Sequence, residues 1–326
     1  MAPLLWVNPP LDLPQELAPS DRGGSCFTQD ESARRALAER GIAVRFGAFP
    51  DPRERWGGAV LSLPREKALL DALAHALAAG ARDRGVLLAA GEIRAGARSA
   101  VARLAARFGS VRKIDSARHC VLYECGEPVR EPFDAAAYET RWTLERPGGA
   151  LDIRSLPGVF SHGRLDDGTA LLLERLDALL AQHPSRALDV GCGAGVIGAA
   201  LLQAQPGLRL VCTDSSALAL AATRATLAAN GFEATVTAAD GLRGITERFD
   251  LIVSNPPFHA GHRQRGDLGA GVFHGVKRAL APRGWLVLVV NRHLPWPNWL
   301  DRNFGGHEVI AANRRYQLLR AQANAG

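Results

Sequence analysis

The second half of the chain alternates short apolar runs with longer segments in which apolar residues recur at helical spacing. The short runs lie at 186–190, 208–214, 234–240, 249–255 and 285–291, and the helical patterns at 169–183, 195–205, 216–231 and 266–284. Strands that alternate with helices are typical of a parallel, doubly wound sheet. Two more apolar segments, 307–313 and 316–321, predict a closing hairpin.

The first half repeats this rhythm in a fainter form. Strands are predicted at 3–8, 42–49, 85–92, 111–115 and 120–125, and helices at 30–41, 65–80 and 97–109. The fold class is therefore α/β, with two Rossmann-like doubly wound domains over 1–130 and 151–326. A segment rich in proline and glycine, 131–150, is interpreted as the linker. The similar size of the two halves suggests duplication.

Size and composition fit this division. The chain has 326 residues, of which 47% are apolar and 22% are charged, so each domain has enough apolar residues for an ordinary core. No apolar run approaches the roughly 18–20 residues that a membrane span needs, and the first residues lack the pattern of a signal peptide. We expect a cytoplasmic protein that does not associate with a membrane.

Cysteine spacing and net charge give less information about the class of function. The five cysteines contain no C-x-x-C pair, so we expect reduced thiols, with neither a disulfide framework nor a metal site. The formal net charge is +6 and comes almost entirely from arginine. This charge indicates either a surface for phosphates or a compositional bias toward arginine, and charge alone does not separate the two.

A glycine-rich turn follows the first predicted strand of the second half. The stretch LDVGCGAG (188–195) places Gly191, Gly193 and Gly195 between a strand and a helix, where glycine lets the backbone turn tightly and approach a ligand. A dinucleotide fingerprint would be G-x-G-x-x-G, whereas here the spacing is G-x-G-x-G after Asp189.

Acidic residues accompany that turn at three successive strand ends. An acid in the loop disfavours a pyrophosphate and suits a ligand with an ammonium and a sulfonium group, as in S-adenosylmethionine. We therefore predict that Asp189 and the three glycines hold its methionine end. Asp214 ends the next strand, where it can bind ribose hydroxyls, and Asp240 is placed for the adenine amine.

The fourth strand of this half ends in SNPPF (254–258), which predicts the acceptor site. Asn255 is held extended by the following proline, so its side-chain oxygen and the carbonyl of Pro256 form a rigid pair of acceptors. Such a pair can grip both hydrogens of a planar amine and direct its lone pair at a methyl group. Phe258 can stack on a planar base.

A similar tripeptide, Asn8-Pro9-Pro10, opens the chain. It is followed by Leu11 and not by an aromatic residue, and no glycine turn precedes it. We interpret this copy as a structural strand end and a remnant of a duplicated domain, without catalytic function.

Together these segments resemble the bacterial ribosomal RNA small subunit methyltransferase C family. The resemblance rests on LPGVFSHGRLDDGTALLLERL (156–176), ALDVGCGAGVIGAALL (187–202), ATLAANG (225–231), FDLIVSNPPFHAG (249–261) and the segment 294–321. It is patchy in the first half and poor over residues 1–60. The family often has Ser-Arg-Asp-Gly-Leu-Asp where this chain has Ser-His-Gly-Arg-Leu-Asp (161–166), so one acidic contact is absent.

The resemblance implies a class I methyltransferase that uses S-adenosylmethionine to methylate guanine N2 in 16S rRNA of the small ribosomal subunit. It further implies that Phe160, Ser161 and Asp166 line the cofactor pocket and that the first domain supports folding or RNA binding without cofactor chemistry. We expect a monomer. The alternatives are methylation of guanine N2 in 23S rRNA, of protein glutamine or of DNA adenine, and a binding protein without turnover.

Overall fold

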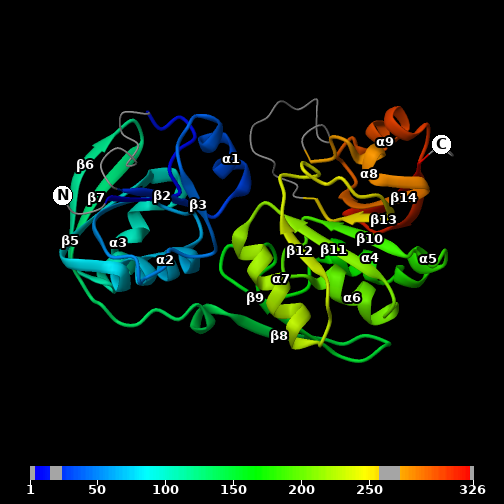
Figure 1. Ribbon diagram of the computed structural model, residues 1–326, viewed down its shortest axis with the longest axis horizontal. Helices are drawn as coiled ribbons and strands as arrows, with labels where there is room; N and C mark the ends of the chain where they lie inside the picture. Colours follow the sequence, from blue (N-terminus) through cyan, green and yellow to red (C-terminus); the bar gives the residue numbers. More distant parts are fainter. Residues whose placement is uncertain (1–3, 15–23, 257–271, 324–326) are drawn as a thin grey trace. The chain divides into compact units, whose positions relative to one another are not determined.

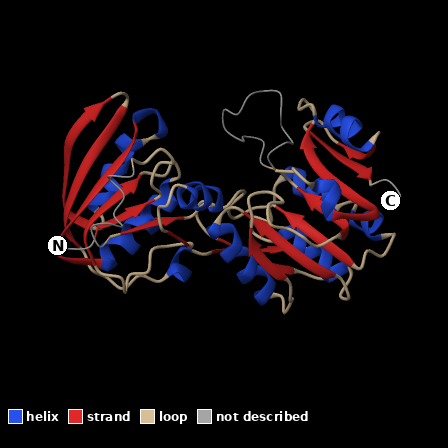
Figure 2. Ribbon diagram, turned by 45° about the horizontal axis from the view of Figure 1, so that its top comes forward, coloured by secondary structure: helices blue, strands red, loops and turns tan. Residues whose placement is uncertain are grey.

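The computed structural model describes residues 4–14, 24–256 and 272–323, and it divides into two compact units, Met1–Glu139 and Thr140–Gly326 (Figure 1). In each unit helices pack against a seven-stranded sheet, which confirms the predicted pair of doubly wound domains (Figure 2). No helix in the described part of the chain is long and apolar enough to cross a membrane.

The first unit has the strand order β3-β2-β1-β4-β5-β7-β6. Its strands are β1 (Leu4–Val7), β2 (Ser25–Thr28), β3 (Val44–Phe46), β4 (Trp56–Ser62), β5 (Ala81–Glu92), β6 (Phe108–Ala117) and β7 (Cys120–Pro128). Its α-helices are α1 (Glu31–Glu39), α2 (Lys67–Gly80) and α3 (Ala100–Ala105). The hydrophobic pattern does not predict β2, which has only four residues, or β4, which carries two adjacent glycines that weaken a strand pattern.

The second unit has the strand order β12-β11-β10-β13-β14-β16-β15. Its strands are β10 (Arg186–Val190), β11 (Arg209–Asp214), β12 (Thr235–Ala238), β13 (Phe249–Ser254), β14 (Leu280–Asn291), β15 (Glu308–Ala312) and β16 (Tyr316–Gln322). Its helices are α4 (Asp167–Leu173), α5 (Leu176–Leu180), α6 (Val196–Ala204), α7 (Ala217–Ala229), α8 (Val276–Ala279) and α9 (Trp296–Phe304).

The two sheets share one topology. In each, five parallel strands in the order third, second, first, fourth, fifth are followed by an antiparallel pair, the seventh strand and then the sixth. Because parallel strands point the same way, the carboxyl ends of β10 to β14 meet at one edge of the second sheet. Ligands of doubly wound sheets bind at this edge.

Two helices of the second unit differ from the sequence expectation. The pattern over 169–183 forms two short helices, since Arg175, with φ −113° and ψ 12°, leaves helical geometry between α4 and α5. Of the helix expected over 266–284, residues 266–271 lie outside the described residues, and only Val276–Ala279 are helical. Strand β14 begins at Leu280, because Pro282 cannot continue a helix. Helix α9 was missed; its prolines lie at its start, where proline is tolerated.

A small ladder precedes the second sheet. Strands β8 (Thr140–Leu144) and β9 (Leu151–Ser155) pair antiparallel, from Thr140 opposite Ser155 to Leu144 opposite Leu151. The segment proposed as a linker, 131–150, thus includes a strand that belongs to the second unit. All five cysteines are free thiols, four of them buried and Cys120 exposed.

Candidate active site

The glycine turn lies at the carboxyl edge of the second sheet and is tied to the neighbouring strand. The backbone N–H groups of Gly191 and Cys192 donate to the carbonyl of Thr213, at 2.7 and 3.0 Å. Gly191 and Gly193 have φ of +75° and +56°, and a Cβ on either would meet no atom within 4 Å. Both line a pocket, so the turn presents bare backbone to it. Gly195 follows as the N-cap of α6.

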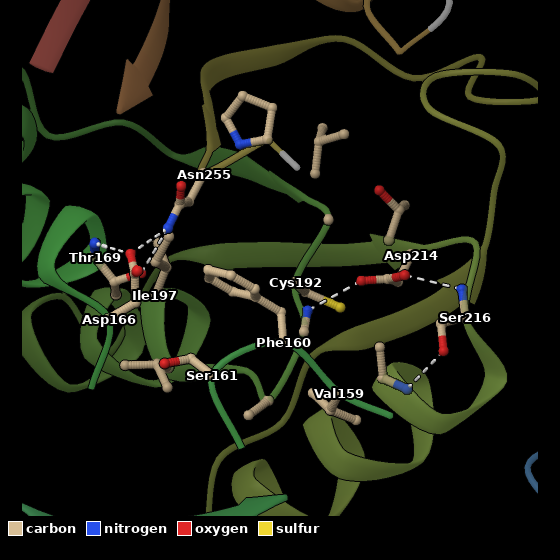
Figure 3. Close-up of a pocket in the computed structure, with 18 of the residues that line it drawn as sticks. Val159, Phe160, Ser161, Asp166, Thr169, Cys192, Ile197, Asp214, Ser216 and Asn255 are labelled. Carbon is tan, nitrogen blue, oxygen red and sulfur yellow. Dashed lines mark hydrogen bonds between the residues drawn. The ribbon is translucent and has the colours of Figure 1, made fainter. Parts of the chain in front are cut away.

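The pocket is a cavity of about 350 Å³ built from every strand end of this edge up to β13. Its walls are the turn after β10, the residues that follow β11 and β12, Asn255 and Pro256 after β13, the loop 158–166 and Trp142 from β8. Figure 3 shows the ring of Phe160 between the Asn255 side and the Asp214 side of this cavity.

Of the three acids predicted at successive strand ends, two lie in the pocket wall. Asp214 accepts hydrogen bonds from the N–H of Gly193 at 3.1 Å and from the N–H of Ser216 at 2.8 Å, so it braces the glycine turn (Figure 3). Asp240 lies further along the wall, 4.0 Å from Arg243, with its side chain 39% exposed. Their positions after adjacent strands fit a ligand that extends across the strand ends.

Asp189 occupies a different place from the one expected. It is fully buried, and it is absent from the pocket wall; its Oδ2 lies on the α6 side of the sheet, 3.6 Å from the point where a Cβ on Gly198 would be. Burial raises its pKa to about 7, and the charge of Asp214 adds to the rise. The backbone N–H of Gly198 acts in the opposite direction and is the smallest of the three causes; neither carboxylate oxygen has a hydrogen-bond partner within the described residues.

Asn255 is held by its amide nitrogen. Its Nδ2 donates to Oδ2 of Asp166 at 2.9 Å and to Oγ1 of Thr169 at 3.0 Å (Figure 3). Its Oδ1 is buried and has no partner among the described residues. Asn255 lines the pocket, so the site contains a fixed acceptor whose hydrogen-bonding capacity the described residues leave unused.

The predicted cofactor residue Asp166 has another visible task. Its Oδ2 caps α4 by accepting from the N–H groups of Gly168 and Thr169, at 2.9 and 3.0 Å, and the same oxygen accepts from Asn255. Asp166 also lines the pocket. At the end of β13, Ser254 donates to the carbonyl of Val190 at 2.6 Å and fixes that strand end to β10.

The loop before α4 carries the other two predicted residues. Phe160 is 59% exposed and lines the pocket, as does Ser161, which has a φ of +57° and donates to the carbonyl of Arg164 at 3.1 Å. His162 anchors this loop, since its ring nitrogens contact the hydroxyls of Ser155 and Thr140 at 3.0 and 2.9 Å.

Two residues of the site were not found from the sequence. Thr169 reads as one polar position in a helical pattern, and only its contact with Asn255 shows its importance. Trp142 lies in the segment interpreted as a linker, yet it lines the pocket with a buried Nε1 that has no partner in the described part of the chain. Pro256 lines the pocket as expected; Phe258 lies outside the described residues.

The first unit shows what Asn8-Pro9-Pro10 does. Asn8 follows β1, and its side chain bridges to Gln29 through Nδ2 to Oε1 at 3.1 Å and through the N–H of Gln29 to Oδ1 at 3.1 Å. By topology β1 corresponds to β10, so this copy stands where the second unit has its glycine turn. The counterpart of β13 is β4, which ends in Ser62 and continues as Leu63-Pro64. The tripeptide is therefore no remnant of SNPPF, and Leu63 stands where Asn255 would be.

Comparisons with known proteins agree in both units. Residues 150–320 match the family model described as Methyltransferase small domain, and residues 2–141 match Methyltransferase small domain N-terminal. A solved structure, the T. thermophilus 16S rRNA N2 G1207 methyltransferase in complex with AdoMet and guanosine, has a TM-score of 0.84. It is 23% identical and is aligned over 99% of this chain and 89% of its own, which shows a shared fold.

Curated relatives are more similar in sequence. A protein named Ribosomal RNA small subunit methyltransferase C from Pseudomonas aeruginosa is 42% identical over 83% of this chain and 80% of its own length. The protein of that name from Shewanella pealeana is 38% identical over 86% and 82%. The one from Stutzerimonas stutzeri is 38% identical over 98% and 93%.

Proposed function

The chain belongs to the ribosomal RNA small subunit methyltransferase C family, and from this we propose that it transfers a methyl group from S-adenosylmethionine to the exocyclic N2 amine of a guanine in 16S rRNA. The observation that supports this chemistry best is Oδ1 of Asn255, a buried acceptor without a partner in the described residues. A site with such an acceptor selects a ligand that brings a hydrogen-bond donor.

The pocket fits S-adenosylmethionine. When bound, this cofactor supplies an electrophilic methyl group on a positively charged sulfur. Gly191 and Gly193 offer bare backbone to its methionine end, and Gly195 starts the helix behind them. Asp214 would accept from the ribose hydroxyls and Asp240 from the adenine amine. Asp189 contributes from behind the glycine turn and not by direct contact.

The remaining wall binds and orients the base. Oδ1 of Asn255 and the carbonyl of Pro256 would accept the two N2 hydrogens, which turns the nitrogen lone pair out of conjugation with the ring. Phe160 lies beside the same space, and Phe258 is proposed to stack on the base. Preorganised acceptors of this kind cost no rearrangement at the moment of transfer.

Asp166 and Thr169 serve as positioning residues for Asn255. An amide has a donor end and an acceptor end, and its neighbours decide which end faces the ligand. The Asp166 carboxylate and the Thr169 hydroxyl both accept from Nδ2, and so Oδ1 is the end left for the substrate. The same amide turned round would present a donor and reject an amine.

The biological setting follows from the family. We propose that the substrate is 16S rRNA within the small ribosomal subunit, that the protein acts as a cytoplasmic monomer without a membrane, and that the first unit helps to hold RNA. Because Leu63 replaces the catalytic asparagine and no glycine turn follows β1, chemistry is assigned to the second unit alone.

Transfer of a tritiated methyl group tests the proposal. Naked 16S rRNA, 30S particles and 23S rRNA are incubated in parallel with the protein and labelled S-adenosylmethionine. We expect label in one or both small-subunit substrates and background counts in 23S rRNA. Label confined to 23S rRNA, or absent from all three, would refute the assignment.

A further inference from the structure

We propose that three arginines beside the acceptor site bind phosphates of the RNA strand that carries the target guanine. The residues, called here the arginine rim, are Arg292, Arg314 and Arg315. This inference rests on the proposed RNA substrate and adds to it a binding surface on the second unit.

The rim lies at the same edge of the sheet as the pocket. Arg292 follows the carboxyl end of β14, and Arg314 and Arg315 form the turn before β16, whose first residue Tyr316 pairs with Asn291 at the end of β14. The two parts are joined, since Nη1 of Arg292 donates to the carbonyl of Asn313 at 3.2 Å and its backbone N–H to the carbonyl of Arg315 at 2.9 Å.

The rim reaches Asn255 indirectly, through the first turn of α4. Nη1 of Arg315 lies 3.5 Å from Oδ2 of Asp167, the residue after the Asp166 that holds the Asn255 amide. The ring of Tyr316, which follows the rim, lies 3.3 Å from the position of a Cβ on Gly168 in the same turn of α4. The rim therefore borders the base-binding side of the site.

The order of the strands shows which part of the site the rim borders. Along the edge, β12, β11 and β10 carry the residues assigned to the cofactor, β13 carries Asn255, and β14 and β16 carry the rim. A base held at Asn255 thus lies between the cofactor and the arginines. The sugar and phosphates of its strand would leave the site on the rim side.

The charge of the rim suits phosphate. All three arginines are exposed, and within the described residues no carboxylate pairs with Arg292 or Arg314. Arg315 has only a long contact with Asp167, and the two side chains are 67% and 68% exposed, so solvent screens that attraction strongly. The groove beside the rim is also lined by Glu174 and Arg175. Their charges cancel, so the net charge of the groove lining stays positive. Guanidinium groups are the side chains best suited to phosphate oxygens.

A salt titration of RNA binding tests the rim directly. The full chain and its variants are titrated with a 16S rRNA transcript labelled at its 3′ end with fluorescein, and anisotropy gives the affinity at several salt concentrations. The test variant is Arg292→Ala/Arg314→Ala. The matched control is Arg209→Ala/Arg248→Ala, which removes the same charge from exposed residues at the amino ends of β11 and β13.

We expect the rim variant to bind RNA about tenfold more weakly and to lose about 1.4 from the slope of log affinity against log salt, as for two phosphate contacts on single-stranded RNA. The control should lose less than about twofold. Arg292→Lys/Arg314→Lys should keep most of the affinity, because lysine retains the charge. S-adenosylmethionine affinity should be unchanged in every variant.

Equal losses of affinity and equal slopes in the rim and control variants would overturn the proposal. No methyl transfer enters this assay, so its outcome is separate from that of the tritium experiment. RNA that is bound through the rim but never methylated would refute the proposed activity alone. If RNA is methylated but the rim and control variants bind it equally well, the arginine rim alone is refuted.

Discussion

At the scale of single residues, the side-chain amide of Asn255 has a hydrogen-bond acceptor at one end and a donor at the other, and its neighbours decide which end faces the ligand. Oδ1 is buried without a partner in the described structure, while Nδ2 is held by Asp166 and Thr169. A side chain that lost one of these two anchors would spend part of its time turned round or displaced. Its acceptor would then be missing when the amine arrives.

Thr169→Val should therefore lower kcat by about 3–10-fold, as expected for the loss of one hydrogen bond worth roughly 1 kcal/mol. The valine keeps the shape, and S-adenosylmethionine affinity should stay near that of the wild type. Thr169→Ser keeps the hydroxyl and should retain activity. Steady-state kinetics and calorimetry measure both quantities.

A double-mutant cycle shows whether Thr169 acts through Asn255. In the Asn255→Ala background, Thr169→Val should cause little further loss, because the amide that it orients is gone. If the two losses multiplied, Thr169 would have an independent structural role and the positioning account would be contradicted.

The buried carboxyl of Asp189 predicts a pH-dependent stability. Its pKa in the folded protein is about 7, against an ordinary value of 3.8, so the folded state holds its proton more tightly than the unfolded chain does. The free energy of stabilisation that comes from this tighter proton binding is fully present below about pH 4 and is lost as the pH rises through 7.

Asp189→Asn removes that ionisation. We expect the variant to be more stable than the wild type by roughly 2–4 kcal/mol at pH 8 and nearly equal to it at pH 4. Urea unfolding at pH 4, 6 and 8 measures the difference. A difference that does not vary with pH would show that Asp189 keeps an ordinary pKa in the folded protein.

At the scale of elements, the glycine turn after β10 depends on backbone conformation as well as on open space. Gly193 has a φ of +56°, and a Cβ there would project from a turn that lines the pocket. Gly244 also has a positive φ, +82°, with open space around its Cβ position, but it lies outside the pocket wall. Alanine substitutions at the two glycines therefore distinguish a loss of stability caused by the backbone from a loss of ligand affinity.

Gly193→Ala and Gly244→Ala should each lower stability by about 1 kcal/mol, because left-handed geometry is unfavourable for alanine. Only Gly193→Ala should also weaken S-adenosylmethionine binding, by about tenfold or more. Thermal unfolding and calorimetry give the two numbers for each variant. Equal affinities in both variants would mean that the turn is not the cofactor cradle.

The elements also show which parts of the site could be predicted from the sequence. The turn after β10 and SNPPF after β13 were predictable because each pairs a distinctive residue pattern with a strand end. Trp142 and Thr169 were not, since no local pattern marks them. The pairing of β8 with β9 brings Trp142 to the pocket, and the packing of α4 against β14 and β16 brings Thr169 to Asn255. Asp189 had the right sequence position, but its side chain is buried behind the turn.

At the scale of the whole molecule, the two units share one strand order and differ at their strand ends. The order was predictable only as a class, because short strands such as β2 carry little pattern. Once the topology is known, Asn8 corresponds to the glycine turn and Leu63 to Asn255. At these two described strand ends the first unit thus has neither a glycine turn nor an asparagine, which the tripeptide Asn8-Pro9-Pro10 alone could not reveal.

Asn8→Ala should leave methyl transfer within a few-fold of the wild type. It removes the bridge to Gln29 and should cost about 1 kcal/mol of stability in the first unit, as for two partly buried hydrogen bonds. Turnover and unfolding are measured on the full chain. A hundredfold loss of turnover with the fold intact would show that the first unit takes part in the chemistry.

The central claim, methylation of guanine N2 by the site at Asn255, is tested most directly by mass spectrometry of nucleosides from 16S rRNA treated with the wild type or with Asn255→Ala. The wild type should yield N2-methylguanosine. Asn255→Ala should form it about 10²–10³-fold more slowly, as for a loss of roughly 3–4 kcal/mol, while cofactor affinity is kept. Methylation on any other atom, or an Asn255→Ala variant as active as the wild type, would contradict the account.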